Sequence, residues 1–258
     1  MKPKTALILC GGQGTRLRPL THQVPKVLLP VQGRPLLEHN IEALKRQGLE
    51  RFILSVGHLK EQIKDYFEDG SGLGFSIEYL EEAEPLGTGG PLRLAQERGL
   101  LPKKTFIMCN GDELKEVNIL KLRRLHNAKK ALATIALVEV DDARDWGVVE
   151  LKGSRILRFV EKPGKGQAPS NLANAGLYLM EPGVADLVPA GRVSLEREVF
   201  PKLAEQGRLF GAKAAKQWFP TDTPEKLRAA QKGWKPRFTG AAASTKQGSK
   251  HADFTHAR

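Results

Sequence analysis

Short apolar runs alternate with amphipathic stretches along the first 140 residues of the chain. Almost wholly apolar runs indicate strands buried on both faces, and strict alternation of apolar and polar residues indicates a strand with one buried face. On these grounds strands are predicted at 5–10, 51–57, 75–81, 105–110 and 131–140. Helical spacing of apolar residues predicts helices at 35–48, 60–70, 90–99 and 118–130. This order predicts a Rossmann-like, mostly parallel sheet with helices on both faces.

After Val140 the apolar runs follow one another with fewer helical stretches between them. Strands are predicted at 146–152, 154–163, 174–180 and 208–215, and helices at 194–207 and 223–231. Gly153 indicates an antiparallel hairpin between the first two strands, and Pro201 implies a break within the first helix. Thr223 and Pro224 suit the N-cap and first turn of the last helix. The expected fold class is α/β, with a smaller antiparallel portion after Val140.

The 258 residues suffice for one large α/β domain, which we place at 1–231. Residues 232–258 are rich in alanine, serine, glycine and lysine and have little to bury, so a basic, disordered tail is expected there. The apolar run near the N-terminus is too short for a signal-peptide core. No run approaches the about 18 apolar residues of a membrane span. We therefore expect a cytoplasmic protein.

The net charge of +12 raises the alternative of a nucleic-acid-binding protein. Residues 232–258 carry six Lys or Arg and one acidic residue, which is +5, so the remaining +7 is spread over 231 residues. Such binding would depend on the tail and weaken steeply with salt. The two cysteines, Cys10 and Cys109, lack metal-ligand spacing and are predicted to be small buried residues.

A glycine-rich loop crowded with positive charge follows the first predicted strand. Its glycines are Gly11, Gly12 and Gly14, and the cations Arg16 and Lys26 come behind them. The spacing fits neither a Walker A motif nor a dinucleotide fingerprint, and glycines alone are also compatible with a plain surface turn. Open backbone amides followed by cations suit a triphosphate. The loop also stands at the carboxyl end of a strand, where parallel sheets bind ligands.

Two carboxylates offer an acidic counterpart to this loop. Asp112 follows the buried strand at 105–110, and Asp222 precedes the last helix. Taken singly, Asp112 is more often a turn residue or helix cap, and Asp222 is compatible with an ordinary acidic residue before a helix. Two carboxylates from separate loops, completed by phosphate oxygens and waters, are a common way of holding Mg²⁺. Both residues are therefore candidate ligands of Mg²⁺.

Taken together, these residues resemble the sugar-phosphate nucleotidyltransferases, also called nucleoside-diphosphate-sugar pyrophosphorylases, along about nine-tenths of the chain. The segment GGQGTRLRPLTHQVPKVLLPV is similar to the family signature GGxGTRLxPLTxxxPKxLLPV. The segments EPLGTGG, NGDE, FVEKP, NAGLYLM and SLEREVFPKLAEQGRLFG follow in the family's order. Of these, EPLGTGG is similar to the family's LGTAG segment, so by resemblance it is the base-binding segment. The resemblance implies a GT-A-like nucleotidyltransferase fold, in agreement with the α/β prediction.

The resemblance also implies an enzyme that makes a nucleoside diphosphate sugar. A sugar 1-phosphate oxygen attacks the α-phosphate of a nucleoside triphosphate in line, and pyrophosphate leaves without a covalent intermediate. By resemblance, Arg16 and Lys26 neutralise the pyrophosphate and α-phosphate, and Lys162 pairs with the phosphate of the sugar. Asp112 and Asp222 are the implied ligands of the Mg²⁺ cofactor. The implied nucleotide-binding residues are Leu9, Gly11, Gly12, Gly14, Thr15, Gly87, Thr88 and Gly111, and the implied sugar-binding residues are Gly147, Glu161, Lys162 and Asn174.

Two positions depart from the family's pattern. Pro220 stands where most members carry the acid of W-x-D-I-G-T, and a proline cannot ligate a metal. The segment WFPTDT resembles a W-x-P-x-D-T variant, which assigns the second metal role to Asp222. Trp146 precedes Gly-Val-Val where many members have tyrosine, and its ring either stacks on the sugar or packs within the protein.

The motifs are most similar to those of short mannose-1-phosphate guanylyltransferases, so GDP-mannose from GTP and mannose 1-phosphate is the expected product. Glucose-1-phosphate thymidylyl-, uridylyl- and cytidylyltransferases and heptose-1-phosphate guanylyltransferases are alternatives. A catalytically silent, sugar-nucleotide-binding regulatory subunit is an alternative of another class, although the chain retains Arg16, Lys26, Asp112 and Lys162. The expected partners are a nucleoside triphosphate and a sugar 1-phosphate, with no membrane and no nucleic acid. Assembly as a homo-oligomer is left open.

Overall fold

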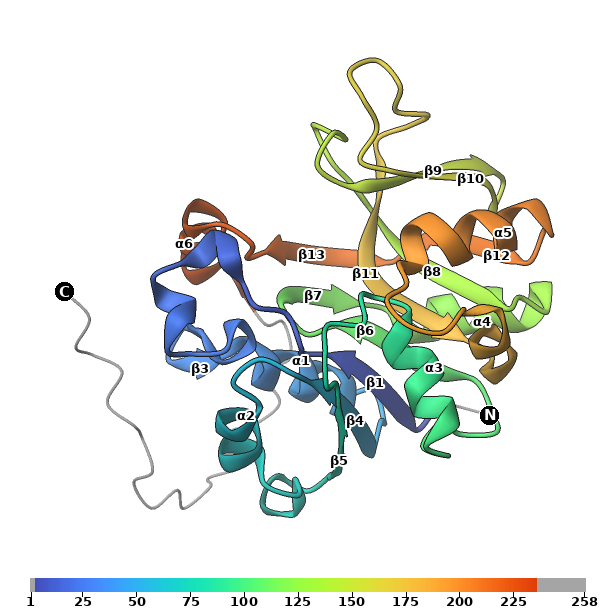
Figure 1. The fold of residues 1–258 in the computed structure, drawn as a ribbon. Helices are drawn as coiled ribbons and strands as arrows, with labels where there is room; N and C mark the ends of the chain where they lie inside the picture. The colour runs from blue at the N-terminus through green and yellow to red at the C-terminus, as the bar shows by residue number, and fades with distance from the viewer. Residues whose placement is uncertain (1–2, 236–258) are drawn as a thin grey trace.

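The computed structural model describes residues 3–235, and its main feature is a nine-stranded sheet (Figure 1). The strand order is β5–β4–β1–β6–β11–β8–β12–β10–β9. These strands are β1 (Thr5–Leu9), β4 (Arg51–Val56), β5 (Ser76–Glu81), β6 (Phe106–Asn110), β8 (Ala133–Glu139), β9 (Gly147–Lys152), β10 (Arg155–Glu161), β11 (Leu172–Met180) and β12 (Leu209–Lys213). Two small sheets pair β2 (Pro30–Val31) with β3 (Arg34–Pro35), and β7 (Glu113–Val117) with β13 (Ala215–Pro220). The α-helices are α1 (Leu36–Lys45), α2 (Lys60–Phe67), α3 (Gly90–Glu97), α4 (Ile119–Lys129), α5 (Phe200–Glu205) and α6 (Pro224–Gly233).

The first half of the sheet is parallel and the second half is mixed. Strands β5, β4, β1 and β6 are parallel neighbours, as the alternation of strands and helices predicts. Strand β11 then runs antiparallel to both β6 and β8, whereas β12 is parallel to β8. Strands β9 and β10 form the hairpin expected around Gly153. This hairpin is joined to the large sheet at two places, because β10 pairs with β12 and β9 pairs with β11.

Helices cover both faces of the sheet, as expected. Apolar residues of α1, α2 and α4 pack on one face, and those of α3 and α5 pack on the other. Strand β1 shows why its sequence is a continuous apolar run: Ile8 joins the first core cluster and Leu7 joins the second, and both are fully buried. Burial on both faces removes the polar alternation of a half-exposed strand.

A third apolar cluster joins the end of the chain to the segment that follows the glycine-rich loop. It includes Leu17 from that segment, Leu114 from β7, and Leu227 with Trp234 from the end of the described chain. In Figure 1, α6 lies beside the segment after β1. The Thr223 side chain caps α6 by accepting a hydrogen bond from the Lys226 backbone N–H, as predicted for an N-cap. This packing holds Asp222, just before the cap, next to the loop.

Three details of the fold were not anticipated. Helix α6 extends to Gly233, two residues beyond the predicted helix end at 231, and Trp234 is only 2% exposed. The predicted disordered tail otherwise lies outside the described residues.

Strand β7 was not predicted from the sequence. Its sequence, ELKEV, carries charged residues at positions that are buried. The predicted break at Pro201 is a change of helix type, from a π-turn at Leu195–Val199 to α5. Within residues 3–235, no helix is long and apolar enough to span a membrane.

We predict that Trp234→Ala lowers the free energy of unfolding by about 3–5 kcal/mol, the usual range for deleting a buried aromatic side chain. Trp234 packs edge-on against Phe219 and His39, and its carbonyl accepts a hydrogen bond from Gln32 Nε2 at 2.5 Å. Lys232→Ala, at an exposed position of the same helix, is expected to change stability by no more than about 0.5 kcal/mol. Urea denaturation measures both, and equal effects would contradict a folded unit that includes Trp234.

Candidate active site

The glycine-rich loop and the Asp112 loop lie together because their strands are neighbours. Leu9, the last residue of β1, is in register with Asn110, the last residue of β6. The Gly111 N–H donates to the Leu9 carbonyl at 2.9 Å, and the Asn40 side chain donates to the Gly111 carbonyl at 3.0 Å. The two loops therefore leave the same edge of the sheet, at the carboxyl ends of parallel strands.

The three glycines of the loop have different reasons to be glycine. Gly14 has a φ of 61°, and a Cβ there would lie 2.8 Å from Thr21 Cγ2. A Cβ on Gly11 would come within 2.7 Å of the Glu82 carboxylate, whereas a Cβ on Gly12 would meet nothing within 4 Å. Only Gly12 therefore faces open space in which a ligand can approach the backbone.

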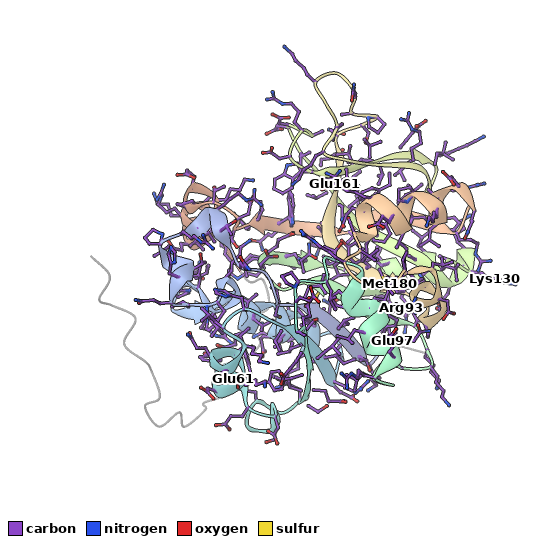
Figure 2. All side chains as sticks on the ribbon, in the orientation of Figure 1. Glu61, Arg93, Glu97, Lys130, Glu161 and Met180 are labelled. Atoms are coloured by element: carbon purple, nitrogen blue, oxygen red, sulfur yellow. The ribbon has the colours of Figure 1, made fainter. Side chains whose placement is uncertain are left out.

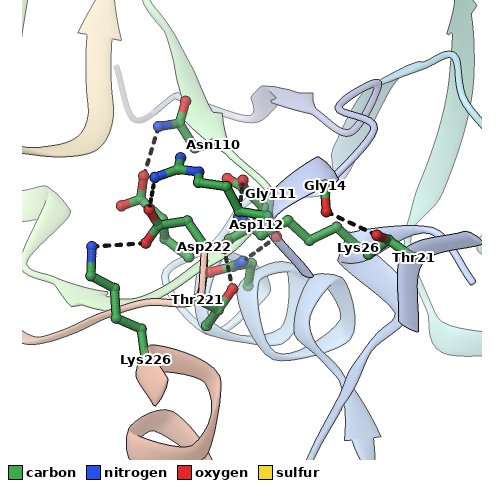
Figure 3. Close-up of polar contacts among 12 residues, drawn as sticks. Gly14, Thr21, Lys26, Asn110, Gly111, Asp112, Thr221, Asp222 and Lys226 are labelled. Carbon is green, nitrogen blue, oxygen red and sulfur yellow. Dashed lines mark hydrogen bonds and ion pairs between the residues drawn. The ribbon is translucent and has the colours of Figure 1, made fainter. Parts of the chain in front are cut away.

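Four of the predicted residues come together as two ion pairs (Figure 3). Lys26 Nζ lies 2.5 Å from Asp112 Oδ2, and the Arg16 guanidinium pairs with the Asp222 carboxylate. Thr221 Oγ1 donates to the main-chain carbonyl of Asp112 at 2.6 Å. That bond ties the end of β13 to the loop after β6, so both candidate metal ligands are fixed relative to each other through the backbone.

Asp112 is held as a carboxylate. Its side chain is 38% exposed, whereas that of Lys26 is 8% exposed. Burial acts to raise the pKa of Asp112, but the Lys26 ammonium and its hydrogen bond outweigh burial and hold that pKa below the usual value. Asp112 is therefore negatively charged at neutral pH, with part of its carboxylate open to solvent.

Asp222 is more enclosed than Asp112, with a side chain 15% exposed. Besides Arg16, it faces Lys226, whose Nζ lies 3.1 Å from Oδ1. This contact is an ion pair without hydrogen-bond geometry, and Oδ1 is a buried oxygen that no donor satisfies. Such an oxygen retains a lone pair for a further cation.

The predicted sugar-side residues lie on β9, β10 and β11. Glu161 ends β10 (Figure 2) and is opposite Gly147, where a Cβ would lie 2.6 Å from Glu161 Oε2. Lys162 follows with a φ of 50°, and its N–H donates to the Trp146 carbonyl at 3.0 Å. The Asn174 amide donates to the Tyr178 hydroxyl at 2.9 Å and accepts from the Gly176 N–H at 2.9 Å. Glycine at 147 thus makes room for Glu161, and Asn174 is positioned by its own strand.

The predicted base-binding segment is connected to the sugar side. Gly87 has a φ of 73°, and a Cβ there would lie 2.4 Å from the Val193 carbonyl oxygen. Thr88 Oγ1 donates to Glu196 Oε2 at 2.5 Å. Burial raises the pKa of Glu161, and repulsion from the nearby Glu196 raises it further, against the opposing Lys162. Glu196 therefore contacts the Thr88 segment and is close enough to Glu161 to repel its charge.

Sequence reasoning missed four residues that organise this region, namely Glu82, Thr221, Glu196 and Lys226. Glu82 accepts from Ser55 Oγ at 2.7 Å and from the Leu86 N–H at 3.0 Å, which holds the strand ends to the base-binding segment. Glu196 stood inside a quoted motif without an assigned partner. Lys226 follows Asp222 by four residues, and this spacing predicts a contact only when both residues lie in one helix. Asp222 precedes the helix, so the spacing did not predict their contact.

Comparison with known proteins agrees with the motifs. The nucleotidyl transferase family model matches residues 5–235. A mannose-1-phosphate guanylyltransferase of Mycobacterium tuberculosis is 40% identical over 224 residues, which are 85% of this chain and 61% of that protein. A UTP–glucose-1-phosphate uridylyltransferase of Synechocystis is 36% identical over 220 residues, 80% of this chain and 57% of that protein. The chain thus spans about three-fifths of the length of these curated relatives.

Solved structures show the same fold. HddC from Yersinia pseudotuberculosis is 28% identical with a TM-score of 0.74, covering 90% of this chain and 100% of that one. A putative glucose-1-phosphate thymidylyltransferase from Bacillus anthracis has a TM-score of 0.80 at 24% identity, covering 88% of this chain and 93% of that one, which supports the fold alone. Since the family model covers nearly all of the described residues, the protein belongs to the nucleotidyl transferase family.

Proposed function

We propose that this protein is a sugar-1-phosphate nucleotidyltransferase that joins a nucleoside triphosphate and a sugar 1-phosphate to give a nucleoside diphosphate sugar and pyrophosphate. The observation that carries the proposal is the pairing of Arg16 with Asp222 and of Lys26 with Asp112, at the edge where β1 and β6 end. Two cations stand where a triphosphate would meet the open backbone of the glycine-rich loop, and two carboxylates stand beside them. Paired cations and carboxylates of this kind suit the transfer of a nucleotidyl group from one phosphate to another. A loop that only made a surface turn would not need them.

In this reaction one bond forms at the α-phosphorus and one breaks. A phosphate oxygen of the sugar 1-phosphate attacks the α-phosphorus, and the bond to the bridging α–β oxygen breaks with its electron pair on the departing pyrophosphate. Arg16 and Lys26 neutralise the phosphates, and the amides of the loop from Gly11 to Gly14 bind the nucleotide, with Leu9, Thr15 and Gly111 around it. No side chain needs to become covalently bound, so the protein contributes position and charge.

We propose that the remaining motif residues orient the other parts of the substrates. Lys162 pairs with the phosphate of the sugar 1-phosphate, and Glu161, Asn174 and the Gly147 backbone bind the sugar. Gly87 and Thr88 lie against the base. The open space before Gly12 and the backbone held by Lys162 at a positive φ are compatible with this arrangement.

Mg²⁺ is the cofactor that the carboxylates fit. Among the described residues, no group of three or more His, Cys, Asp or Glu side chains is placed to hold a metal, so a closed protein site is absent there. Mg²⁺ is typically bound by one or two carboxylates together with substrate phosphates and water. Asp112, partly exposed, and Asp222, with an oxygen that lacks a donor, supply such a pair. The ion supplies positive charge to the phosphates when bound.

For the substrates we propose GTP and mannose 1-phosphate. The supporting observation is that several relatives above 35% identity are named mannose-1-phosphate guanylyltransferases or guanyltransferases, including those of Mycobacterium tuberculosis and Xenopus laevis. The Synechocystis relative favours UTP with glucose 1-phosphate as the second candidate. A pyrophosphate-release screen of five nucleoside triphosphates against mannose, glucose, N-acetylglucosamine and heptose 1-phosphates distinguishes them. A cytoplasmic location remains a prediction.

Asp112→Asn and Lys162→Ala are each predicted to lower the rate of pyrophosphate release by at least about 10²-fold, because each removes a charge that faces phosphate or metal. Asp112→Asn should lower stability, because it leaves the nearly buried Lys26 ammonium without its anion, but the fold should survive, since the amide oxygen can still accept from Lys26 and Thr221 bonds the main chain of residue 112. Lys165→Ala, an exposed lysine three residues beyond Lys162, is the matched control and should retain normal activity. Near-normal turnover in either site variant, with circular dichroism unchanged, would refute the assigned roles.

Asp222→Asn is predicted to raise the Mg²⁺ concentration needed for half-maximal activity by at least about tenfold, because a neutral amide oxygen is a weaker ligand than a carboxylate. Glu225→Gln, an exposed carboxylate three residues on, should leave that concentration unchanged. Titrating activity with MgCl₂ and measuring Mg²⁺ binding by calorimetry test the pair. An unchanged Mg²⁺ requirement in Asp222→Asn would place the second ligand elsewhere.

Glu161→Gln is predicted to stabilise the protein at neutral pH relative to acidic pH while it lowers sugar affinity. The pKa of Glu161 is raised in the folded state, so wild-type stability is lost as the pH rises from the unfolded-state pKa through the folded-state one. The variant lacks that loss, so the stability of the variant relative to the wild type should increase as the pH rises from 4 to 8. Thermal unfolding from pH 4 to 8 measures the difference, with Glu84→Gln, at an exposed position, as the control. A difference independent of pH would contradict the assignment.

A further inference from the structure

We infer that Lys226 is a positioning residue that fixes Trp146, and through it the backbone of Lys162, for binding of the sugar 1-phosphate. The effect of Lys226 on binding of the sugar 1-phosphate rests on the proposed function. Its structural part, a clamp between α6 and the residue before β9, rests on contacts alone. Lys226 belongs to none of the motifs that point to the family.

The Lys226 ammonium lies between an anion and an aromatic ring. Its Nζ is 3.1 Å from Asp222 Oδ1 and 4.3 Å from the centre of the Trp146 ring, and its side chain is 28% exposed. A cation within about 6 Å of a ring centre is attracted by the electrons of the ring face, and tryptophan gives the strongest attraction. The Asp222 carboxylate holds the ammonium in place by charge attraction, because its buried Oδ1 makes no hydrogen bond and faces this cation. Figure 3 shows Lys226 reaching this carboxylate from the start of α6.

Trp146 is held from a second side by Trp218. The two rings meet edge to face, with centres 4.6 Å apart and planes at 68°. Trp218 Nε1 donates to Glu113 Oε2 at 2.6 Å, so the supporting ring is itself fixed. Residues 141, 142, 144 and 145, just before Trp146, are exposed. The Trp146 ring is therefore the point at which this segment is attached to β13 and α6.

The position of Trp146 bears on Lys162 through the main chain. The Lys162 N–H donates to the Trp146 carbonyl at 3.0 Å, and Lys162 has a φ of 50°. A residue other than glycine adopts that conformation at a cost and keeps it only where its surroundings enforce it. A fixed Trp146 carbonyl is one such constraint, so Lys226 acts on Lys162 without touching it.

These contacts form one connected path across the site. Arg16, in the segment after the glycine-rich loop, pairs with Asp222, and Asp222 also pairs with Lys226. Lys226 in turn lies over the Trp146 ring, and the Trp146 carbonyl accepts a hydrogen bond from the Lys162 N–H. The path joins the side proposed for the triphosphate to the side proposed for the sugar phosphate. Removing the ammonium breaks the path next to the sugar side and leaves the Arg16–Asp222 pair in place.

Lys226→Met keeps the aliphatic stem and removes the charge. We expect the KM for the sugar 1-phosphate to rise about 5- to 30-fold, from the usual strength of a partly buried cation–π contact, with kcat and the KM for the nucleoside triphosphate within about twofold. Lys226→Arg should restore the KM, because a guanidinium also stacks on indole and pairs with carboxylate. Lys232→Met, at an exposed position of the same helix, should be without effect. An equal rise in both KM values would overturn the proposal.

Combining Lys226→Met with Trp146→Leu tests whether Lys226 acts through the ring. The double variant should have the same sugar 1-phosphate KM as Trp146→Leu alone, and multiplied effects would overturn the proposal. Thermal unfolding of the wild type, the two single variants and the double variant gives a second test, which does not depend on catalytic activity. The loss of melting temperature in the double variant should be smaller than the sum of the single losses, and strict additivity would overturn the clamp. If the wild type released no pyrophosphate with any substrate pair, the proposed function would be wrong. The melting temperatures would still show whether Lys226 and Trp146 interact.

Discussion

The register between β1 and β6 is the constraint on which the rest of the site depends. Leu9 lies opposite Asn110, and the Gly111 N–H bonds the Leu9 carbonyl, so two loops that are about 100 residues apart in sequence begin at the same point. A shift of one residue would turn the side chains of one strand to the opposite face of the sheet. It would also separate the cations of the first loop from Asp112. Because the sheet is buried on both faces, the core enforces this register.

The cations of the site are paired with carboxylates before any substrate enters. Lys26 is nearly buried, and an ammonium in that position requires a nearby anion, which Asp112 provides. Arg16 and Lys226 share Asp222 in the same way. A triphosphate would therefore compete with carboxylates for these cations, and a divalent ion would compete with the cations for the carboxylates. Binding of both together exchanges one set of paired charges for another, which avoids leaving a buried charge alone.

The sequence allowed much of the large sheet and its helices to be predicted, because buried strands and amphipathic helices have distinct periods. Strand β7 was missed because Lys115 is buried as a charge: its Nζ donates to the Asn110 and Gly176 carbonyls, which a hydrophobicity pattern cannot anticipate. The motif residues Arg16, Lys26, Asp112 and Asp222 were found by spacing and resemblance. Lys226 was not, because its partners Trp146 and Asp222 meet it only in the folded chain.

The replacement of the usual acid by Pro220 follows from the geometry of β13. Pro220 ends this strand opposite Glu113, and Thr221, which is fully buried, turns toward the Asp112 carbonyl. The strand ends there, and the chain bends at Asp222, whose carboxylate pairs with Arg16 and Lys226. A carboxylate two residues beyond Pro220 thus faces the cations of the site, because Thr221 anchors the residue between them to the Asp112 loop.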